Sequence, residues 1–139
     1  MNAPLYTVDI LRLAATLPEP RALDRVDGSA ELRSPTCGSV VRTEVQVDSG
    51  RVTALSQHVQ ACAFGQASAS LLAAGAIGKC PVEVAAAVDA LAAWLDGTAG
   101  TPGDWPGLEA LAPARSRKGR HGAILLPFRT LAAALEPAR

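Results

Sequence analysis

Residues 40–47 have the most regular alternation of apolar and polar side chains in the chain. From position 41, valine or threonine occupies every odd position, and charged or amide side chains lie between them. This alternation is typical of a strand with one buried face. Asp48-Ser49-Gly50 then forms a turn, and residues 51–61 return as a second strand with weaker alternation. Residues 31–35 add an edge strand, so the pattern predicts a small three-stranded antiparallel sheet.

Helix-forming residues dominate the segments on both sides of these strands. Apolar side chains recur at helical spacing over residues 6–17, with Thr7 or Asp9 as the cap. A further helix is expected over residues 81–95, because Pro81 is well suited to a first helical turn. The remaining expected helices are residues 66–77, a short turn at 108–111, and 123–135, in which Pro127 marks a kink or the true start.

The order of these elements predicts the fold class. One helix precedes the strands and the other helices follow them, which indicates an α+β protein with helices packed on one face of the sheet. A chain of 139 residues has the length of one domain, since domains contain roughly 100–200 residues. We therefore expect a single domain over residues 1–139.

Composition and charge exclude several classes of protein. Hydrophobic residues make up 49% and charged residues 19%, which is too apolar for a disordered chain. Thirteen basic residues balance thirteen acidic ones, so no general attraction to nucleic acid or to an anionic membrane is expected. No apolar run approaches the ~18 residues of a membrane helix. Residues 1–9 lack the pattern of a secretory signal, and we expect a cytoplasmic protein.

Three cysteines are the residues best suited to chemistry. In the cytosol thiols stay reduced, which favours metal binding or thiol reactions over disulfides. Cys37 lies between Pro35 and Gly38, on an expected tight, exposed turn, where a packed thiol and a functional one are equally supported. Cys62 lies where a strand gives way to a helix, and the free N–H groups there stabilise a thiolate. Cys80 occupies a capping position before a helix, and we interpret it as a replacement for serine or threonine.

His121 follows a run of basic residues, just before the last expected helix. Taken alone, a histidine in such surroundings is more often a solvated surface group than a ligand. Cys37, Cys62 and His121 are separated by 24 and 58 residues, and no C-x-x-C spacing is present. Spacing alone is therefore weak support for a metal site.

Two cysteine motifs are similar to those of a known family. Pro35-Thr36-Cys37-Gly38 resembles the first-ligand turn of the U-type iron–sulfur cluster scaffold proteins, which are IscU, SufU and the N-terminal part of NifU. Cys62 and the following Ala67-Ser68-Ala69-Ser70 resemble the second cysteine and its helix. The resemblance extends over residues 6–136, and residues 103–118 are similar to an insertion of the SufU branch.

The resemblance implies a function and a set of partners. It implies a scaffold or carrier that binds iron or an iron–sulfur cluster and passes it on, and not an enzyme. A cysteine desulfurase would supply sulfur, and acceptor apo-proteins would receive the cluster. The ligands that it implies are Cys37, Cys62 and His121, the last matching a histidine of IscU proteins.

Two ligand positions of the family are changed in this chain. Ser39 stands where the family has an aspartate, and Gly122 stands where it has a third cysteine. We therefore expect neither residue to be a ligand. A set of two thiolates and one imidazole leaves one tetrahedral position open. The candidates for that position are a small thiol, a partner's residue, a second copy of the chain in a homo-oligomer and, more remotely, Cys80, which we expect to lie one helix length away.

Two alternative functions are kept at this stage. In one, the protein holds zinc and accepts sulfur from a cysteine desulfurase through a zinc-activated thiol. The missing third cysteine counts against this alternative. In the other, the protein is an interaction module that has kept the fold without binding metal, and Ser39 and Gly122 favour it.

Overall fold

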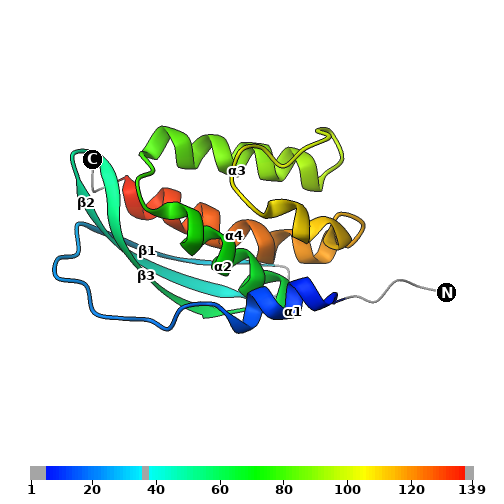
Figure 1. Ribbon diagram of the computed structural model, residues 1–139, viewed down its shortest axis with the longest axis horizontal. Coiled ribbons are helices and arrows are strands. Elements are labelled where there is room, and N and C mark those ends of the chain that lie inside the picture. The colour runs from blue at the N-terminus through cyan, green and yellow to red at the C-terminus, as the bar shows by residue number, and fades with distance from the viewer. Residues whose placement is uncertain (1–5, 36–37, 137–139) are drawn as a thin grey trace.

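The computed structural model describes residues 6–35 and 38–136 and contains one antiparallel sheet with helices (Figure 1). This arrangement confirms the α+β class. The strand order is β1-β2-β3, with each strand antiparallel to its neighbour. The elements are α1 (Val8–Ala15), β1 (Gly28–Arg33), β2 (Val40–Asp48), β3 (Arg51–Gln60), α2 (Ala63–Ala76), α3 (Pro81–Leu95), the 3-10 helix η1 (Leu108–Ala114) and α4 (Lys118–Leu135).

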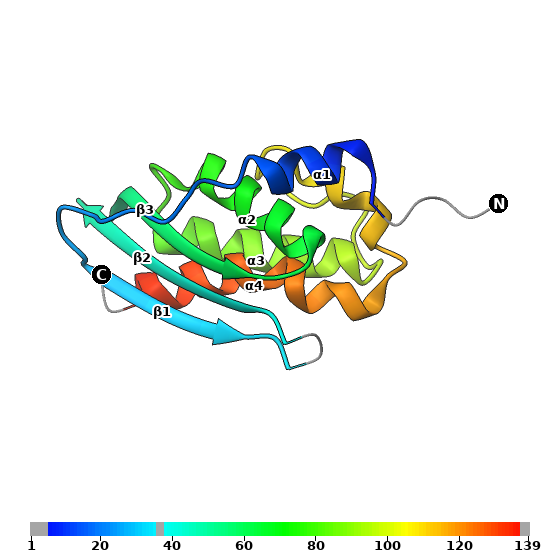
Figure 2. The same cartoon turned by 90° about the horizontal axis from the view of Figure 1, so that it is seen from below.

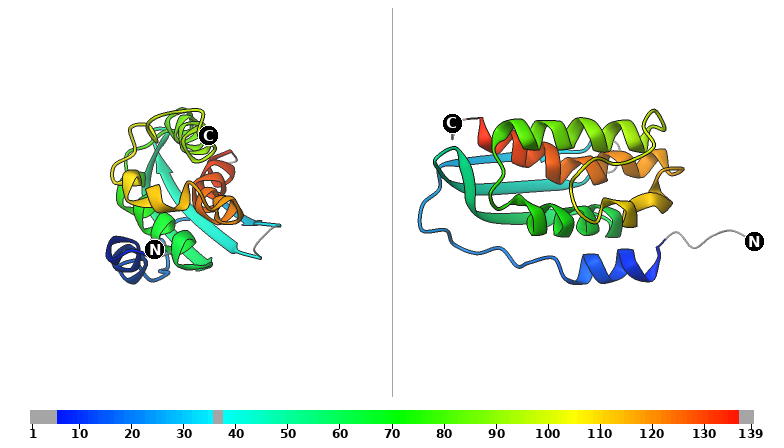
Figure 3. Two further views of the ribbon diagram at one scale, coloured as in Figure 1. Left: turned by 90° about the vertical axis from the view of Figure 1, so that its right-hand side faces the viewer. Right: turned by 45° about the horizontal axis from the view of Figure 1, so that its top comes forward.

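The helices form layers on one face of the sheet. Helices α2 and α4 contact the strands, α3 packs on α4, and α1 packs on α2. Figure 2 views the molecule from the opposite face of the sheet, which the helices leave uncovered. The end-on view in Figure 3 shows the same separation of sheet and helices. No helix in the described part of the chain combines the length and apolar character needed to cross a membrane.

The alternation along β2 is confirmed by burial. Val41, Thr43 and Val45 are fully buried toward the helices, and the residues between them are more exposed. The register between β2 and β3 pairs Val40 with Gln60. Because the strands are antiparallel, the start of β2 and the end of β3 lie at the same end of the sheet.

Several element boundaries differ from those expected. Helix α2 begins at Ala63 instead of 66, β1 begins at Gly28 instead of 31, and η1 continues to Ala114 instead of ending at 111. The largest difference is in α4, which begins at Lys118 instead of 123 and contains Pro127. Glycines in the first turns of α4 lower helix propensity, but burial of its apolar face outweighs that cost.

Helices α2 and α4 approach each other closely near their N-terminal ends. A Cβ atom at Gly65 would lie 3.3 Å from the carbonyl oxygen of Ala123 and 2.6 Å from the Cβ of Ala61. One turn later, the buried Ser68 hydroxyl donates to the carbonyl oxygen of Ile124. This hydrogen bond joins the first half of α2 to α4 inside the core.

A long connection between α3 and α4 closes over α2. Trp105 is buried in this connection, and its Nε1–H donates to the carbonyl oxygen of Leu71 at 2.9 Å. Its ring also meets Phe128 of α4 edge-on, with the ring centroids 5.0 Å apart. Gly75 allows this approach, since a Cβ there would lie 2.6 Å from the indole nitrogen. Trp105 thus links the connection between α3 and α4 to both α2 and α4.

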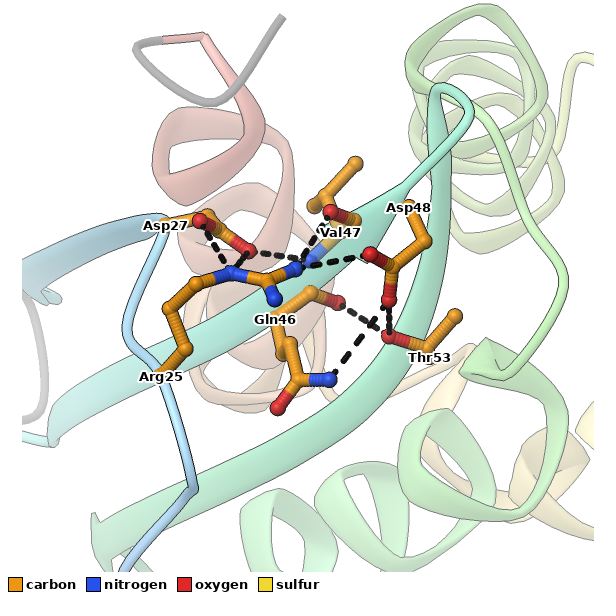
Figure 4. Close-up of polar contacts among 6 residues, drawn as sticks. All are labelled: Arg25, Asp27, Gln46, Val47, Asp48 and Thr53. Carbon is orange, nitrogen blue, oxygen red and sulfur yellow. Dashed lines mark hydrogen bonds and ion pairs between the residues drawn. The ribbon is translucent and has the colours of Figure 1, made fainter.

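A polar network attaches the segment before β1 to the β2–β3 hairpin (Figure 4). The Arg25 guanidinium donates to Asp27 and Asp48 at 2.8 Å and to the carbonyl oxygen of Val47 at 3.0 Å. The hydrogen bond from Arg25 lowers the pKa of Asp27, helped by the backbone N–H of Val47. The Thr53 hydroxyl, followed by Arg25, lowers the pKa of Asp48.

We predict that two glycine-to-alanine substitutions in helices have opposite effects on the free energy of unfolding. Gly75→Ala forces the buried indole of Trp105 to move, and we expect a loss of about 1–3 kcal/mol. Gly119→Ala introduces a methyl group into open space and should gain about 0.5–1 kcal/mol. Urea denaturation measures both, and a stabilised Gly75→Ala variant would contradict the described packing of Trp105.

We predict that the Arg25 network makes stability depend on pH in the acidic range. Both aspartates have pKa values below 3.8 in the folded protein, so their contribution is present above about pH 4 and is lost as the pH falls. The free energy of unfolding should therefore fall more steeply below pH 4 in the wild type than in Arg25→Gln. Arg12→Gln, which breaks only an exposed pair with Asp9, is the control. Parallel curves for wild type and Arg25→Gln would be evidence against the network.

Candidate functional site

Segments far apart in the sequence meet at one end of the molecule. The end of β1, the start of β2 and the end of β3 lie there, together with the first turns of α2 and α4 (Figure 2). The contact between Gly65 and Ala123 fixes the two helix starts side by side. This end therefore combines the segments that contain the candidate residues Cys62, His121 and Gly122.

Cys62 lies between β3 and α2, as expected, and is the N-cap residue of α2 because this helix begins earlier than predicted. Its backbone is extended, with φ −66° and ψ 173°, and it lies two residues beyond Gln60, the last residue of β3. The side chain is half-buried and makes no capping hydrogen bond. The thiol is therefore held at a helix N-terminus without being used as the cap.

The connection from β1 to β2 is held closed by backbone hydrogen bonds. Ser34 N–H donates to the carbonyl oxygen of Ser39 at 2.8 Å, and Gly38 N–H donates to that of Ser34 at 3.0 Å. Gly38 has φ +71°, a left-handed conformation that glycine adopts without strain. Ser39 is 4% exposed. Cys37 lies outside the described residues, so its expected exposed turn and its role as a ligand stay predictions.

His121 lies within the first two turns of α4 instead of before the helix. Its Nε2 atom is 2.9 Å from the carbonyl oxygen of Ala114 and 3.1 Å from that of Arg115. Carbonyl oxygens only accept hydrogen bonds, so Nε2 carries a proton. In the neutral ring this leaves the lone pair on Nδ1, which is the nitrogen available to a metal. Metal-binding histidines commonly donate their second ring N–H to a backbone carbonyl in this way.

Gly122 is part of the regular helix α4, so a side chain at this position is compatible with the backbone. Within residues 6–35 and 38–136, no group of three His, Cys, Asp or Glu side chains lies close enough together to hold a metal ion. The structure thus brings the segments of Cys62 and His121 to one end.

Cys80 belongs to a different part of the molecule. It is the N-cap of α3, as expected, and its backbone N–H donates to Oε1 of Glu83 at 3.1 Å. This hydrogen bond and the ion pair with Arg51 lower the pKa of Glu83. Cys80 and Cys62 are thus both N-cap residues of helices, so a variant at Cys80 can serve as a control for a variant at Cys62.

The basic residues before His121 divide into two kinds. Arg115 is structural: its Nε–H donates to the carbonyl oxygen of Trp94 at 2.9 Å, and its guanidinium lies over the Trp94 ring. In contrast, Arg117, Lys118 and Arg120 form no ion pair with a carboxylate in the described part of the chain. The α4 helix also has no acidic residue in its first turn.

Two features of this site were missed from the sequence alone. The first is the pair of backbone carbonyl acceptors for His121, which come from the end of η1. The only available signal was the short distance in sequence between residues 114 and 121. The second is the position of His121 and the basic residues inside α4, which the glycines at 119 and 122 concealed.

Comparisons with known proteins agree with this architecture. A family model of the NifU-like N-terminal domain matches residues 14–101. A crystal structure of a nitrogen-fixing NifU-like protein (N-terminal) from Brucella abortus is 32% identical, covers 96% of this chain and 94% of its own, and has a TM-score of 0.89. No curated protein matches the chain.

A second structure is similar in fold. It is a protein from Fervidobacterium islandicum AW-1 that is described as a putative iron–sulfur cluster assembly scaffold protein for the SUF system. It is 19% identical, covers 95% of this chain and 97% of its own, and has a TM-score of 0.82. At this level of identity the likeness concerns the fold alone.

We predict that the neutral ring of His121 carries its proton on Nε2. Two carbonyl oxygens at hydrogen-bond distance stabilise this tautomer. Long-range proton–nitrogen NMR correlations of the metal-free protein, recorded at a pH where the ring is neutral, identify the protonated nitrogen. His58, which is exposed on β3, serves as the internal comparison. A proton on Nδ1 of His121 would mean that these carbonyl contacts do not exist in solution.

Proposed function

Because the chain belongs to the family of NifU-like N-terminal domains, we propose that it is a scaffold or carrier for iron–sulfur cluster assembly. In this proposal Cys37, Cys62 and Nδ1 of His121 bind iron or the cluster. A cysteine desulfurase supplies the sulfur, and acceptor apo-proteins receive the product. The cluster is the cargo of this protein and not a resident cofactor.

The observation that supports this proposal most directly is the placement of Cys62 and His121. Both lie at the starts of helices that the Gly65–Ala123 contact keeps side by side. Cys62 offers a thiol that is not used as a helix cap. The hydrogen bonds from Nε2 of His121 leave Nδ1 as its free ring nitrogen. The thiol of Cys62 is a soft ligand and the ring nitrogen of His121 is a borderline ligand, and both kinds of ligand bind iron–sulfur clusters.

The ligand set favours release as well as binding. Two thiolates and an imidazole carry two formal negative charges, whereas the family's set of one aspartate and three thiolates carries four. A [2Fe–2S] cluster usually has four protein ligands, mostly thiolates. The changes at Ser39 and Gly122 therefore weaken the hold on the cargo. A weaker hold suits a carrier that passes the cluster to another protein.

The interaction module without metal is the alternative that these same positions favour. Ser39 is buried in the turn before β2, where its carbonyl accepts from Ser34, and this gives it a structural role. Gly122 has no side chain to offer as a ligand. The two functions differ in whether the chain binds a metal or cluster at all.

We predict that anaerobic reconstitution with iron and sulfide loads the wild-type chain and the Cys80→Ser variant, but not Cys62→Ser. Each of the two cysteines is the half-buried N-cap residue of a helix, so both substitutions place serine at an N-cap position. Serine is also a better N-cap than cysteine, so neither variant should unfold. Iron and sulfide analysis, with absorption spectra, measures the loading, which we expect to fall at least tenfold in Cys62→Ser.

The controls separate the remaining possibilities. His121→Gln keeps an N–H group that can reach the carbonyl of Ala114 but lacks Nδ1, so it tests the ring as a ligand apart from its hydrogen bonds. Metal analysis of the protein purified anaerobically distinguishes iron from zinc. No loading of the wild-type chain would reject the scaffold function and favour the interaction module. Equal loading of Cys62→Ser and wild type would show that Cys62 is not a ligand and would contradict the proposed ligand set.

A further inference from the structure

Two buried polar side chains lie opposite each other on the helix-facing side of the sheet. Thr43 of β2 pairs directly with Gln57 of β3, and the two residues are 0% and 6% exposed. In the part of the chain that the structure describes, Thr43 Oγ1 and Gln57 Oε1 are the only buried side-chain oxygen or nitrogen atoms without a hydrogen-bond partner. Directly opposed residues of antiparallel strands have Cβ atoms roughly 4.5–5.5 Å apart, so both unpaired oxygens belong to one location.

The orientation of the Gln57 carboxamide is determined by α2. Its Nε2 group donates to the carbonyl oxygen of Ala69 at 3.0 Å. A carbonyl oxygen only accepts hydrogen bonds, so the reversed amide would place two acceptors together. Oε1 of Gln57 therefore has to point away from Ala69, and it needs a donor from elsewhere.

The other buried hydroxyl groups show that this core does not commonly leave such groups unpaired. Protein atoms hydrogen-bond to the hydroxyl groups of Ser56, Ser68, Ser70 and Thr130. An unpaired polar group in the interior is destabilising, and natural proteins pair nearly all of them with protein atoms or ordered water. Two such groups at one location therefore indicate a bound ligand.

We propose that Thr43 and Gln57 bind one ordered water molecule inside the core, beside α2. The water donates one hydrogen bond to Gln57 Oε1 and forms a second with the Thr43 hydroxyl, which can donate or accept. Buried waters typically form about three hydrogen bonds to groups that are otherwise unpaired. The site links β2 and β3 to the helix that begins after Cys62, and it does not depend on the binding of any cargo.

Water fits this location better than the alternatives. Both side chains are buried, so a larger ligand cannot reach the two oxygens without opening the core. A small cation such as ammonium could donate the hydrogen bonds. However, none of the buried residues in the described part of the chain is charged, so the charge of such a cation would be uncompensated. A direct hydrogen bond between Thr43 and Gln57 would need no ligand, but the structure does not contain one.

A high-resolution crystal structure of the wild-type chain tests the site directly. We expect a water molecule about 2.5–3.2 Å from both Thr43 Oγ1 and Gln57 Oε1. In solution, magnetic relaxation dispersion of water counts the long-lived internal water molecules. The double variant Thr43→Val with Gln57→Met replaces both polar groups by apolar groups of similar shape, so it should hold one long-lived water fewer than the wild type.

Thr130→Val is the matched control. Thr130 is also fully buried, but its hydroxyl already donates to the carbonyl oxygen of Leu126 at 2.7 Å. This variant removes a buried threonine hydroxyl that has a protein partner. It should therefore hold as many long-lived waters as the wild type.

Thermal denaturation of the single and double variants provides an independent measurement. Thr43→Val or Gln57→Met alone leaves one polar group without its bridge and should lower the melting temperature by roughly 2–8 °C. The double variant leaves neither group unpaired, so its loss should be smaller than the sum of the two single losses.

Two results would overturn the proposal. The first is a crystal structure in which the Thr43 hydroxyl donates directly to Gln57 Oε1 with no water beside them. The second is an equal number of long-lived waters in the wild type and in a folded double variant. Neither result would bear on the scaffold function, which cluster loading tests separately.

Discussion

The close contact between α2 and α4 is the constraint on which the candidate site depends. Gly65 is required because a side chain there would collide with Ala61 and press against Ala123. Ser68 adds a buried hydrogen bond to the carbonyl oxygen of Ile124. Cys62 lies one turn before Gly65, and His121 lies two residues before Ala123. A change in the packing of these helices would therefore move both candidate ligands.

The hydrophobic pattern was enough to predict the sheet, but the start of α4 depended on tertiary contacts. Alternation over 40–47 reflects burial of one face of β2, which is a local property of a strand. Glycines at 119 and 122 lower the intrinsic helix propensity of the residues before 123. The structure extends α4 to Lys118 because its apolar residues are buried against the sheet and α2, and no local pattern reports that energy.

The candidate site was also predictable only in part. The N-cap position of Cys80 followed from Pro81, and the location of Cys62 between a strand and a helix followed from the end of the strand pattern, although its N-cap role depended on the earlier start of α2. The tautomer of His121 was not predictable, because its partners are backbone carbonyls of η1, which any residue types could have provided. Likewise, composition could not distinguish Arg115, which stacks on Trp94, from the three cations that follow it.

Helix periodicity gives Gly122 and Ala123 different surroundings although they are consecutive. Successive residues of an α-helix are rotated by about 100°, so Ala123 meets Gly65 while Gly122 faces another direction. The packing contact at Ala123 and the neighbouring position 122 thus have separate structural roles. Under the proposed function, a single replacement at position 122 adds or removes a metal-binding side chain without a change in the contact between the two helices. The affinity for the proposed cargo can therefore change during evolution while the architecture is inherited unchanged.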